Sequence, residues 1–372
     1  MKTRNISKLV LALPIACLLL GLSDGAVAQS MMDRTNRGVV ELLTGGADAT
    51  SSRIAEDLAA VVDDGTTRRV LPVVGKGTLQ NLIDLKMLRG IDVAIVQSDV
   101  LEYGKTQRNV PGVEANITYV TKLYSEEFHL LASEGIKTVS DLAGKKVNFG
   151  PQGDGTSITG PKIFDLLGIK IQATELDQRL ALAKLASGEI AAIGYVGGKP
   201  VPFFADLPAQ SGLHFLAIPL NAGIVAAYVP GKLSAEDYPN LVKPQESVDT
   251  AAVTAVLLVA NLQVDSERYR AVAAFVDAFF TQLAKLQEEP HHPKWREVNL
   301  AAELPGWKRF PAADAWLKRN PPAPVAMSEQ QLRDIFMRFL EERSRSTGQT
   351  LSAQQKNELF DQFRRWQSSQ SR

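Results

Sequence analysis

An alternation of short apolar segments with amphipathic ones, in the first third of the chain, most constrains its fold. The apolar segments Val39–Leu43, Val70–Val74 and Val93–Val96 have the length of strands. Between them, residues 51–62 and 79–88 repeat apolar side chains at helical spacing, and glycines lie at the connections. Strands that are apolar along their whole length are covered on both faces. The pattern therefore predicts an α/β fold with a parallel sheet.

A second α/β unit follows in the middle of the chain. A strand is expected at Val147–Gly150, a helix ending near Leu167, a helix at Asp177–Glu189 and a strand at Ile190–Val196. The turn that feeds this unit, residues 141–146, contains glycine and lysine. The chain is thus expected to form two α/β lobes.

Two long extended segments flank the second unit, at Ile117–Ala132 and Val253–Leu262. We interpret them as strands that connect the lobes, one leaving the first lobe and one returning to it. Lobe 1 is then expected at 37–125 and 257–320, and lobe 2 at 126–256. Two connecting strands make a hinge, and a ligand is expected in the cleft between the lobes.

A proline-rich segment ends this body, and two amphipathic helices are expected within 325–368. Each begins with a capping box, Ser328 with Gln331 and Ser352 with Gln355. We expect a helical hairpin with one apolar face. Two interpretations stay open: the face packs on the body of the protein, or it is a docking or oligomer surface.

The N-terminus has the layout of a secretory signal peptide. Basic residues precede the apolar run Leu9–Leu22, and the small residues Ala26 and Ala28 form a cleavage site before Gln29. This run is too short to span a bilayer, which takes about 20 residues. We therefore expect residues 1–28 to be removed and the mature protein to be periplasmic.

Composition excludes several classes of function. Cys17, the only cysteine, lies inside the expected signal peptide, so the mature chain has no thiolate for catalysis or for a metal. The formal charge near zero leaves no basic field for nucleic acid. The four histidines lack the spacing of a zinc helix, and no nucleophile elbow of a serine hydrolase is present. We expect no enzyme activity, no metal site and no cofactor.

Several segments, in order and spacing, resemble the TAXI proteins, which are extracytoplasmic solute receptors associated with TRAP transporters. They span about residues 38–318, most of the mature body. The matching segments are Thr44-Gly45-Gly46, the run Gly90-Ile91-Asp92-Val93-Ala94-Ile95-Val96-Gln97-Ser98-Asp99, Leu142-Ala143-Gly144-Lys145-Lys146-Val147, Gly153-Asp154-Gly155-Thr156, and the late segment from His292-Pro293 to Trp316.

The resemblance implies a two-lobed periplasmic-binding-protein fold, type II-like, and a receptor that delivers organic anions or amino acids to a TRAP-type membrane permease. The chain departs from the family after the first strand, where a Gly-Thr-Tyr-Tyr-like run usually follows. Residues 47–52 here contain no aromatic pair to wall a ligand, and an acid, Asp48, is present. The alternative from another class is a periplasmic sensing or interaction module that acts on a membrane partner protein.

Loops ahead of helices are the first candidates for ligand contact, because helix N-termini offer unpaired backbone N–H groups to a carboxylate. Glycines let the backbone approach a ligand, and hydroxyls add donors. The alternatives are a plain helix cap and a solvated lysine. The candidates in these loops are Gly45, Gly46, Lys76, Thr78, Gly155, Thr156 and Ser157.

Four further polar residues belong to the predicted site, and Asp48 is its twelfth residue. Gln97 and Ser98 come just past the third strand, where ligands bind in open α/β sheets. Tyr124 lies on the first connecting strand, and Tyr195 ends a strand of the second unit. Either tyrosine can serve packing instead of ligand contact.

Two acids have alternative interpretations. Asp48 either recognises an ammonium group of the ligand or caps the first helix, and capping is the favoured interpretation. Asp99 either belongs to the site with Gln97 and Ser98 or caps the helix after the third strand, and capping is again the favoured interpretation.

Overall fold

The structure is a computed structural model that describes residues 37–106 and 112–321, together with residues 333, 336, 337, 340, 352, 354–357 and 359–361 of the tail. The expected signal peptide at 1–28 and the first capping box of the tail, at Ser328, lie outside the described residues. Described residues up to Arg319 belong to one compact unit and the later ones to a second. Within the described ranges, no helix is long and apolar enough to cross a membrane.

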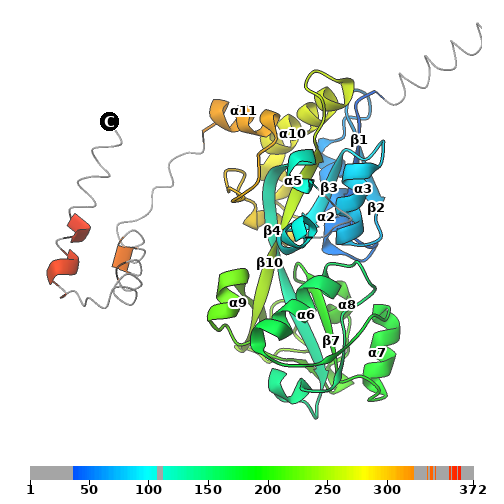
Figure 1. Ribbon diagram of the computed structural model, residues 1–372, viewed down its shortest axis with the longest axis vertical. Coiled ribbons are helices and arrows are strands. Elements are labelled where there is room, and N and C mark those ends of the chain that lie inside the picture. The colour runs from blue at the N-terminus through cyan, green and yellow to red at the C-terminus, as the bar shows by residue number, and fades with distance from the viewer. Residues whose placement is uncertain are drawn as a thin grey trace, which may run out of the picture. The chain divides into compact units, whose positions relative to one another are not determined.

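One mixed sheet runs through the body (Figure 1). Its strand order is β2-β1-β3-β10-β4-β7-β5-β6, with β8 paired to β4 and β9 paired to β10. The strands are β1 (Val39–Thr44), β2 (Arg69–Val74), β3 (Val93–Gln97), β4 (Ile117–Ser133), β5 (Lys146–Asn148), β6 (Gln172–Thr174), β7 (Ala192–Gly197), β8 (Leu213–Phe215), β9 (Val229–Ser234) and β10 (Ser247–Ala260).

Helices cover both faces of this sheet (Figure 1). The α-helices are α2 (Thr50–Val62), α3 (Thr78–Met87), α4 (Ser98–Thr106), α5 (Val113–Asn116), α6 (Thr156–Leu167), α7 (Gln178–Ala186), α8 (Pro202–Ala205), α9 (Ala222–Ala227), α10 (Glu267–Leu286) and α11 (Pro311–Arg319). The 3-10 helices are η1 (Val139–Leu142), η2 (Ala209–Ser211) and η3 (Pro293–Glu297).

The first lobe has the predicted parallel core. Strand β1 pairs in parallel with β2 and β3. One apolar cluster joins α2 and α10 to this sheet around the buried side chains of Phe275 and Trp295. A second cluster, which includes Leu82 and Leu101, joins α3 and α4 to the opposite face. Burial on both faces explains why β3, between these clusters, is apolar from Val93 to Val96.

The second lobe repeats the plan around β7, which pairs in parallel with β5 and antiparallel with β4. Phe149 and Phe164 pack α6 against one face, and their ring centroids lie 5.8 Å apart. Leu185 of α7 and Phe204 of α8 belong to the cluster on the other face. Each lobe therefore has its own pair of apolar clusters.

Two long antiparallel strands, β4 and β10, connect the lobes (Figure 1). Their pairing runs from Ala252 opposite Glu127 to Ala260 opposite Ile117. Both connecting strands were predicted, and the two-lobed α/β fold is confirmed. β10 begins at Ser247, six residues before its predicted start at Val253, because its polar first part pairs with β9 of the second lobe.

The interpretation of Asp99 as a helix cap is wrong. Helix α4 begins at Ser98, immediately after β3, so Asp99 lies inside its first turn. The buried Asp99 carboxylate instead accepts hydrogen bonds from the hydroxyls of Thr159, at 2.7 Å, and Tyr228, at 3.2 Å. Both partners belong to the second lobe, so Asp99 ties the lobes together.

The described tail residues agree with part of the predicted hairpin. The second capping box forms: Ser352 N–H donates to Gln355 Oε1 at 2.9 Å, and Gln355 N–H donates to Ser352 Oγ at 3.2 Å. The rings of Phe336 and Phe360 lie 5.5 Å apart and join the two predicted helical segments. The choice between body packing and docking stays open.

Candidate functional site

A cavity of about 660 Å³ lies between the two lobes. The first lobe contributes the loops after β1 and β2 and the end of β3. The second contributes the loop after β5, the start of α7, the end of β7 and α8, while Glu126 and Ala255 of the connecting strands lie between them. Ligands of parallel sheets bind at the carboxyl ends of the strands, as here. The volume falls within the range of about 300–1,000 Å³ for small-molecule sites.

Seven of the twelve predicted residues lie in the wall of this cavity, so the loops chosen from the sequence do meet in space. The five others do not line the cavity, and one of them, the half-buried Ser98, is the first residue of α4. Those in the wall are Gly45, Gly46, Asp48, Lys76, Thr78, Gln97 and Tyr195. Those outside it are Ser98, Tyr124, Gly155, Thr156 and Ser157.

The loop before α6 already holds a carboxylate of its own. Asp154 Oδ1 accepts a hydrogen bond from the N–H of Gly155 at 2.7 Å. The N–H groups of Ser157 and Ile158 reach carbonyls of the preceding turn. Ser157 Oγ accepts from the N–H of Gly153 at 3.2 Å and donates to the carbonyl of Asp154 at 2.7 Å. The donors on which the predicted carboxylate contact depended are therefore taken by the chain.

Thr156 and Gly155 hold the wall in place from behind. Thr156 is fully buried, and its Oγ1 accepts the N–H of Val196 at 3.0 Å, which ties α6 to β7. A Cβ at Gly155 would lie 1.5 Å from Oε1 of Gln97. Gly155 is thus needed because the Gln97 side chain lies against its backbone.

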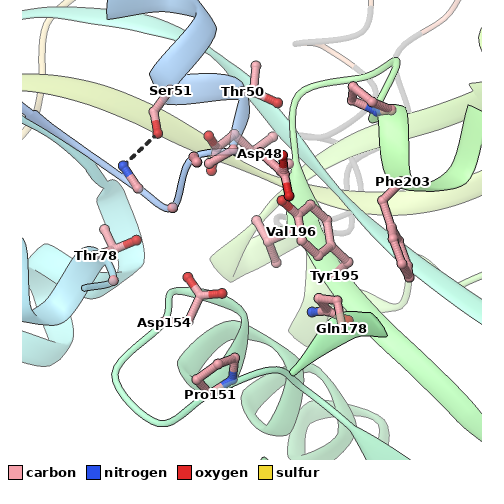
Figure 2. A pocket seen from close by; sticks show the side chains of 18 of the residues that line it. Asp48, Thr50, Ser51, Thr78, Pro151, Asp154, Gln178, Tyr195, Val196 and Phe203 are labelled. Atoms are coloured by element: carbon pink, nitrogen blue, oxygen red, sulfur yellow. Dashed lines mark hydrogen bonds between the residues drawn. The ribbon is translucent and has the colours of Figure 1, made fainter. Parts of the chain in front are cut away.

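Asp48 does not cap the first helix. The N-cap residue of α2 is Ala49, and no side chain accepts a hydrogen bond there. Ser51 Oγ instead accepts the N–H of Gly45 at 2.9 Å and closes the loop. The favoured capping interpretation of Asp48 is therefore wrong, and its exposed carboxylate stands at the cavity (Figure 2).

The loop after β2 touches the second lobe. The N–H of Leu79 donates to the carbonyl of Gly153 at 3.2 Å. Gly77 has a φ of +126°, and a Cβ there would lie 2.6 Å from the same carbonyl oxygen, so only glycine permits this approach. Lys76 is exposed in the cavity wall and makes no hydrogen bond or ion pair with any described residue.

Glu126 of β4 is a wall residue that the sequence analysis missed. It is almost fully buried, at 6% exposure. Its Oε2 accepts from Gln97 Nε2 at 2.5 Å, and its Oε1 accepts from the hydroxyl of Tyr124 at 3.2 Å. Burial raises the pKa of Glu126 to about 7, although these two hydrogen bonds oppose the rise. Tyr124 thus supports the site by holding Glu126.

Carboxylates surround the hydroxyl of Tyr195. Burial raises the pKa of Tyr195, and the charges of Asp154, Glu126 and Asp48 raise it further. Burial likewise raises the pKa of Asp154, opposed only by the N–H of Gly155. Acidic side chains of both lobes and of the hinge therefore act on the hydroxyl of Tyr195.

The sequence profile of the NMT1-like family matches residues 42–306, well over half of the chain. This chain belongs to the NMT1-like family. The matched range contains the second lobe, most of the first lobe, both connecting strands and every residue of the cavity wall.

Three solved structures are similar to this NMT1-like chain. One, described as a periplasmic transporter, is 14% identical, with a TM-score of 0.46, and the match covers 68% of this chain and 84% of that chain. The alkanesulfonate-binding protein SsuA from Xanthomonas axonopodis pv. citri is 14% identical, with a TM-score of 0.42 and coverages of 82% and 93%. The periplasmic binding protein BugD is 11% identical, with a TM-score of 0.46 and coverages of 76% and 94%.

The lobes of this NMT1-like chain are joined at a further point beside the cavity. The hydroxyl of Thr50 donates to the carbonyl of Gly198 at 2.9 Å. Behind it, the buried Lys294 bonds Glu127 at 2.6 Å and Glu297 at 2.7 Å. The positive charge of Lys294 is thus used outside the cavity.

Histidines take no part in the cavity wall. His129 is fully buried among aromatic rings, and its Nε2 lies 2.7 Å from the hydroxyl of Tyr238. Burial lowers the pKa of His129 to about 3. Among the residues that the structure describes, no three His, Cys, Asp or Glu side chains gather closely enough to hold a metal ion.

Proposed function

We propose that this protein is a periplasmic solute-binding receptor of the TAXI class. It captures a small organic anion or amino acid between its lobes and delivers it to a TRAP-type membrane permease. The observation that carries the proposal is the cavity between two lobes that two connecting strands join. Such lobes can open and close around a solute.

The proposed binding site joins the seven predicted wall residues to Glu126 and Asp154. These residues come from both lobes and from the hinge, so a bound solute contacts all the parts that move. No role as a catalyst is proposed, since the wall offers no activated nucleophile. Export through the expected signal peptide supports the periplasmic location.

A thermal-shift screen of the mature protein, refolded to remove carried solute, tests the receptor function. The panel contains dicarboxylates, keto acids, amino acids, amines and sugars. A solute at ~100 times its Kd adds roughly 2.7 kcal/mol of stability, which raises the Tm by several degrees. A flat screen with correctly refolded protein, and no small molecule in natively purified protein, would contradict the proposal and favour a sensing or interaction module.

A disulfide lock tests whether the solute enters between the lobes. A Cβ built at Gly198 lies 2.9 Å from Cγ2 of Thr50, so a Thr50→Cys, Gly198→Cys pair is within disulfide reach. The expected mature chain contains no other cysteine. The oxidised pair should exclude a solute that the reduced pair binds, and both single variants should bind in either state. Equal binding by the oxidised and reduced pair would place the solute elsewhere.

A further inference from the structure

Large apolar side chains are unevenly distributed over the wall of the cavity. The two loops of the first lobe, residues 45–51 and 75–78, contribute only glycines, alanines, hydroxyl residues, Asp48 and Lys76. The second lobe contributes rings and branched side chains from the loop after β5, from α7, from the end of β7 and from α8. We call these five residues the apolar wall: Pro151, Leu182, Tyr195, Pro202 and Phe203.

Phe204, which is fully buried, holds the two aromatic rings of the apolar wall. Its ring centroid lies 5.0 Å from that of Phe203 and 5.8 Å from that of Tyr195, both in edge-to-face contact. The turn that carries Phe203 is anchored as well, because the N–H of Val201 donates to the hydroxyl of Tyr238 at 2.8 Å. Rings held in this way lose little conformational freedom when a solute packs against them.

Leu182 and Phe203 have a second apolar side besides the one that the fold uses. Both are half-buried, pack on the apolar cluster behind them and also line the cavity. Leu180 of the same helix, by contrast, is 49% exposed and does not line the cavity. Clustered apolar surface that faces a cavity is typical of a binding site, because an apolar group of the ligand removes it from water.

The volume of the cavity gives a second, independent indication. The lobes are already in contact, since the N–H of Leu79 donates to the carbonyl of Gly153 and the hydroxyl of Thr50 donates to that of Gly198. The volume of about 660 Å³ is therefore not a space between lobes that stand apart. It is typical of sites that enclose drug-sized ligands, and a short dicarboxylate or a small amino acid would leave much of it unfilled.

We infer that the solute carries an aromatic or bulky apolar group, which packs against the apolar wall while its polar end faces the loops of the first lobe. This inference rests on the proposed receptor function and narrows its ligand class to organic acids and amino acids with such a group. Figure 2 shows the rings of Tyr195 and Phe203 at the cavity, together with Ser51 and Thr78 of the first lobe. An aromatic ring of the solute would meet these two rings in offset-stacked or edge-to-face contact.

Matched pairs of compounds test the inference by calorimetric titration of the refolded protein. In each pair a phenyl group replaces one methyl hydrogen: L-alanine with L-phenylalanine, pyruvate with phenylpyruvate, and ethylamine with phenethylamine. The three pairs differ in the charge of the polar end, so the comparison does not depend on that charge. At least one phenyl compound should bind at least about tenfold tighter than its partner, which corresponds to about 1.4 kcal/mol.

Variants of the apolar wall show whether this preference arises there. Phe203→Ala should weaken binding of the phenyl compound by about tenfold and that of its partner far less, whereas a folding defect would weaken both. Phe203→Leu, which keeps an apolar side chain, should retain part of the preference. Leu180→Ala, on α7 but outside the cavity, should change neither affinity. Equal binding within every pair, or a preference that Phe203→Ala leaves intact, would overturn the inference.

Natively purified protein provides a measurement that does not depend on these compounds. Molecules released by denaturation are separated by reversed-phase chromatography and identified by mass spectrometry. A stoichiometric molecule with an aromatic ring or a bulky alkyl group supports the inference. Release of a short dicarboxylate, glutamate, a sugar or a polyamine, or binding of such polar solutes alone, overturns it while the receptor function stands. If nothing is released and nothing binds, both are overturned.

Discussion

Replacing Glu126 with glutamine should stabilise the unliganded protein increasingly as the pH rises from 4.5 to 7. The pKa of Glu126 is about 7 in the folded chain, against an ordinary value of 4.5. Between these values the folded state keeps a proton that the unfolded state has lost. Wild-type stability therefore falls through this window as the pH rises, whereas glutamine does not titrate.

The size of the effect follows from the two pKa values. At 1.36 kcal/mol per pH unit, the carboxylate costs about 3 kcal/mol at pH 7 and above, and nothing below pH 4. A gain of this size corresponds to a rise in Tm of roughly 4 °C for a chain of this length. The amide of glutamine also places an N–H opposite one of the two donors that face Glu126. This mismatch lowers the free energy of unfolding by about 1–3 kcal/mol at every pH. The quantity to measure is therefore how the difference in free energy of unfolding between Glu126→Gln and wild type changes with pH.

Urea unfolding of ligand-free protein, followed by circular dichroism at several pH values between 4 and 8.5, measures this difference. Titrating groups that do not interact with Glu126 are common to both proteins and cancel in the comparison. Glu134→Gln, at an exposed position just after β4, is the control and should show no such dependence. A difference between Glu126→Gln and wild type that stays constant across the range would show that Glu126 is ionised throughout, and would refute the reasoning.

Three further substitutions test the supports of the cavity. Lys294→Met should lower the free energy of chemical unfolding by about 3–5 kcal/mol, because it leaves Glu127 buried without its cation. Adding Glu127→Gln should recover much of that loss, and no recovery would show that the pair is not coupled. Thr156→Val should lower the free energy of unfolding by about 1–3 kcal/mol, because a backbone N–H of β7 loses its acceptor, and an unchanged urea midpoint would contradict this role. Gly155→Ala should displace the Gln97 side chain, and the free energy of solute binding should fall more than the free energy of unfolding. Calorimetry and thermal unfolding measure the two, and equal losses would contradict a role of Gly155 in the site.

The sequence predicts the fold well because its main signal is hydrophobic periodicity. The connecting strands β4 and β10 were found since most of their residues are apolar and buried. Short elements such as α8 and β8 were not found, because four or three residues carry no measurable period. The early start of β10 was missed because its polar residues pair with β9, a contact that local sequence does not show.

The site is harder to predict because a polar side chain can serve either a ligand or the chain itself. Thr156 and Ser157 stand where a ligand donor is expected, yet their hydroxyls bond the backbone. Asp99 has the position of a cap, but its partners lie 60 and 129 residues away. Glu126 follows Tyr124 by two residues, so the two share a face of β4. Glu126 lines the cavity and bonds Gln97 of β3, and this contact between distant strands is not visible in the local sequence.

The charges that the two lobes bring to the cavity link solute binding to closure of the lobes. The lobes already meet at Leu79 with Gly153 and at Thr50 with Gly198, so the closed form has its own hydrogen bonds. Closure without a solute brings the carboxylates of Asp48 and Asp154, from opposite lobes, toward one another around a common cavity. Their repulsion opposes closure, and a cation between them removes it. The empty receptor would then favour the open form, and the loaded receptor would favour the closed form. A membrane permease can distinguish these two forms by binding one of them more tightly.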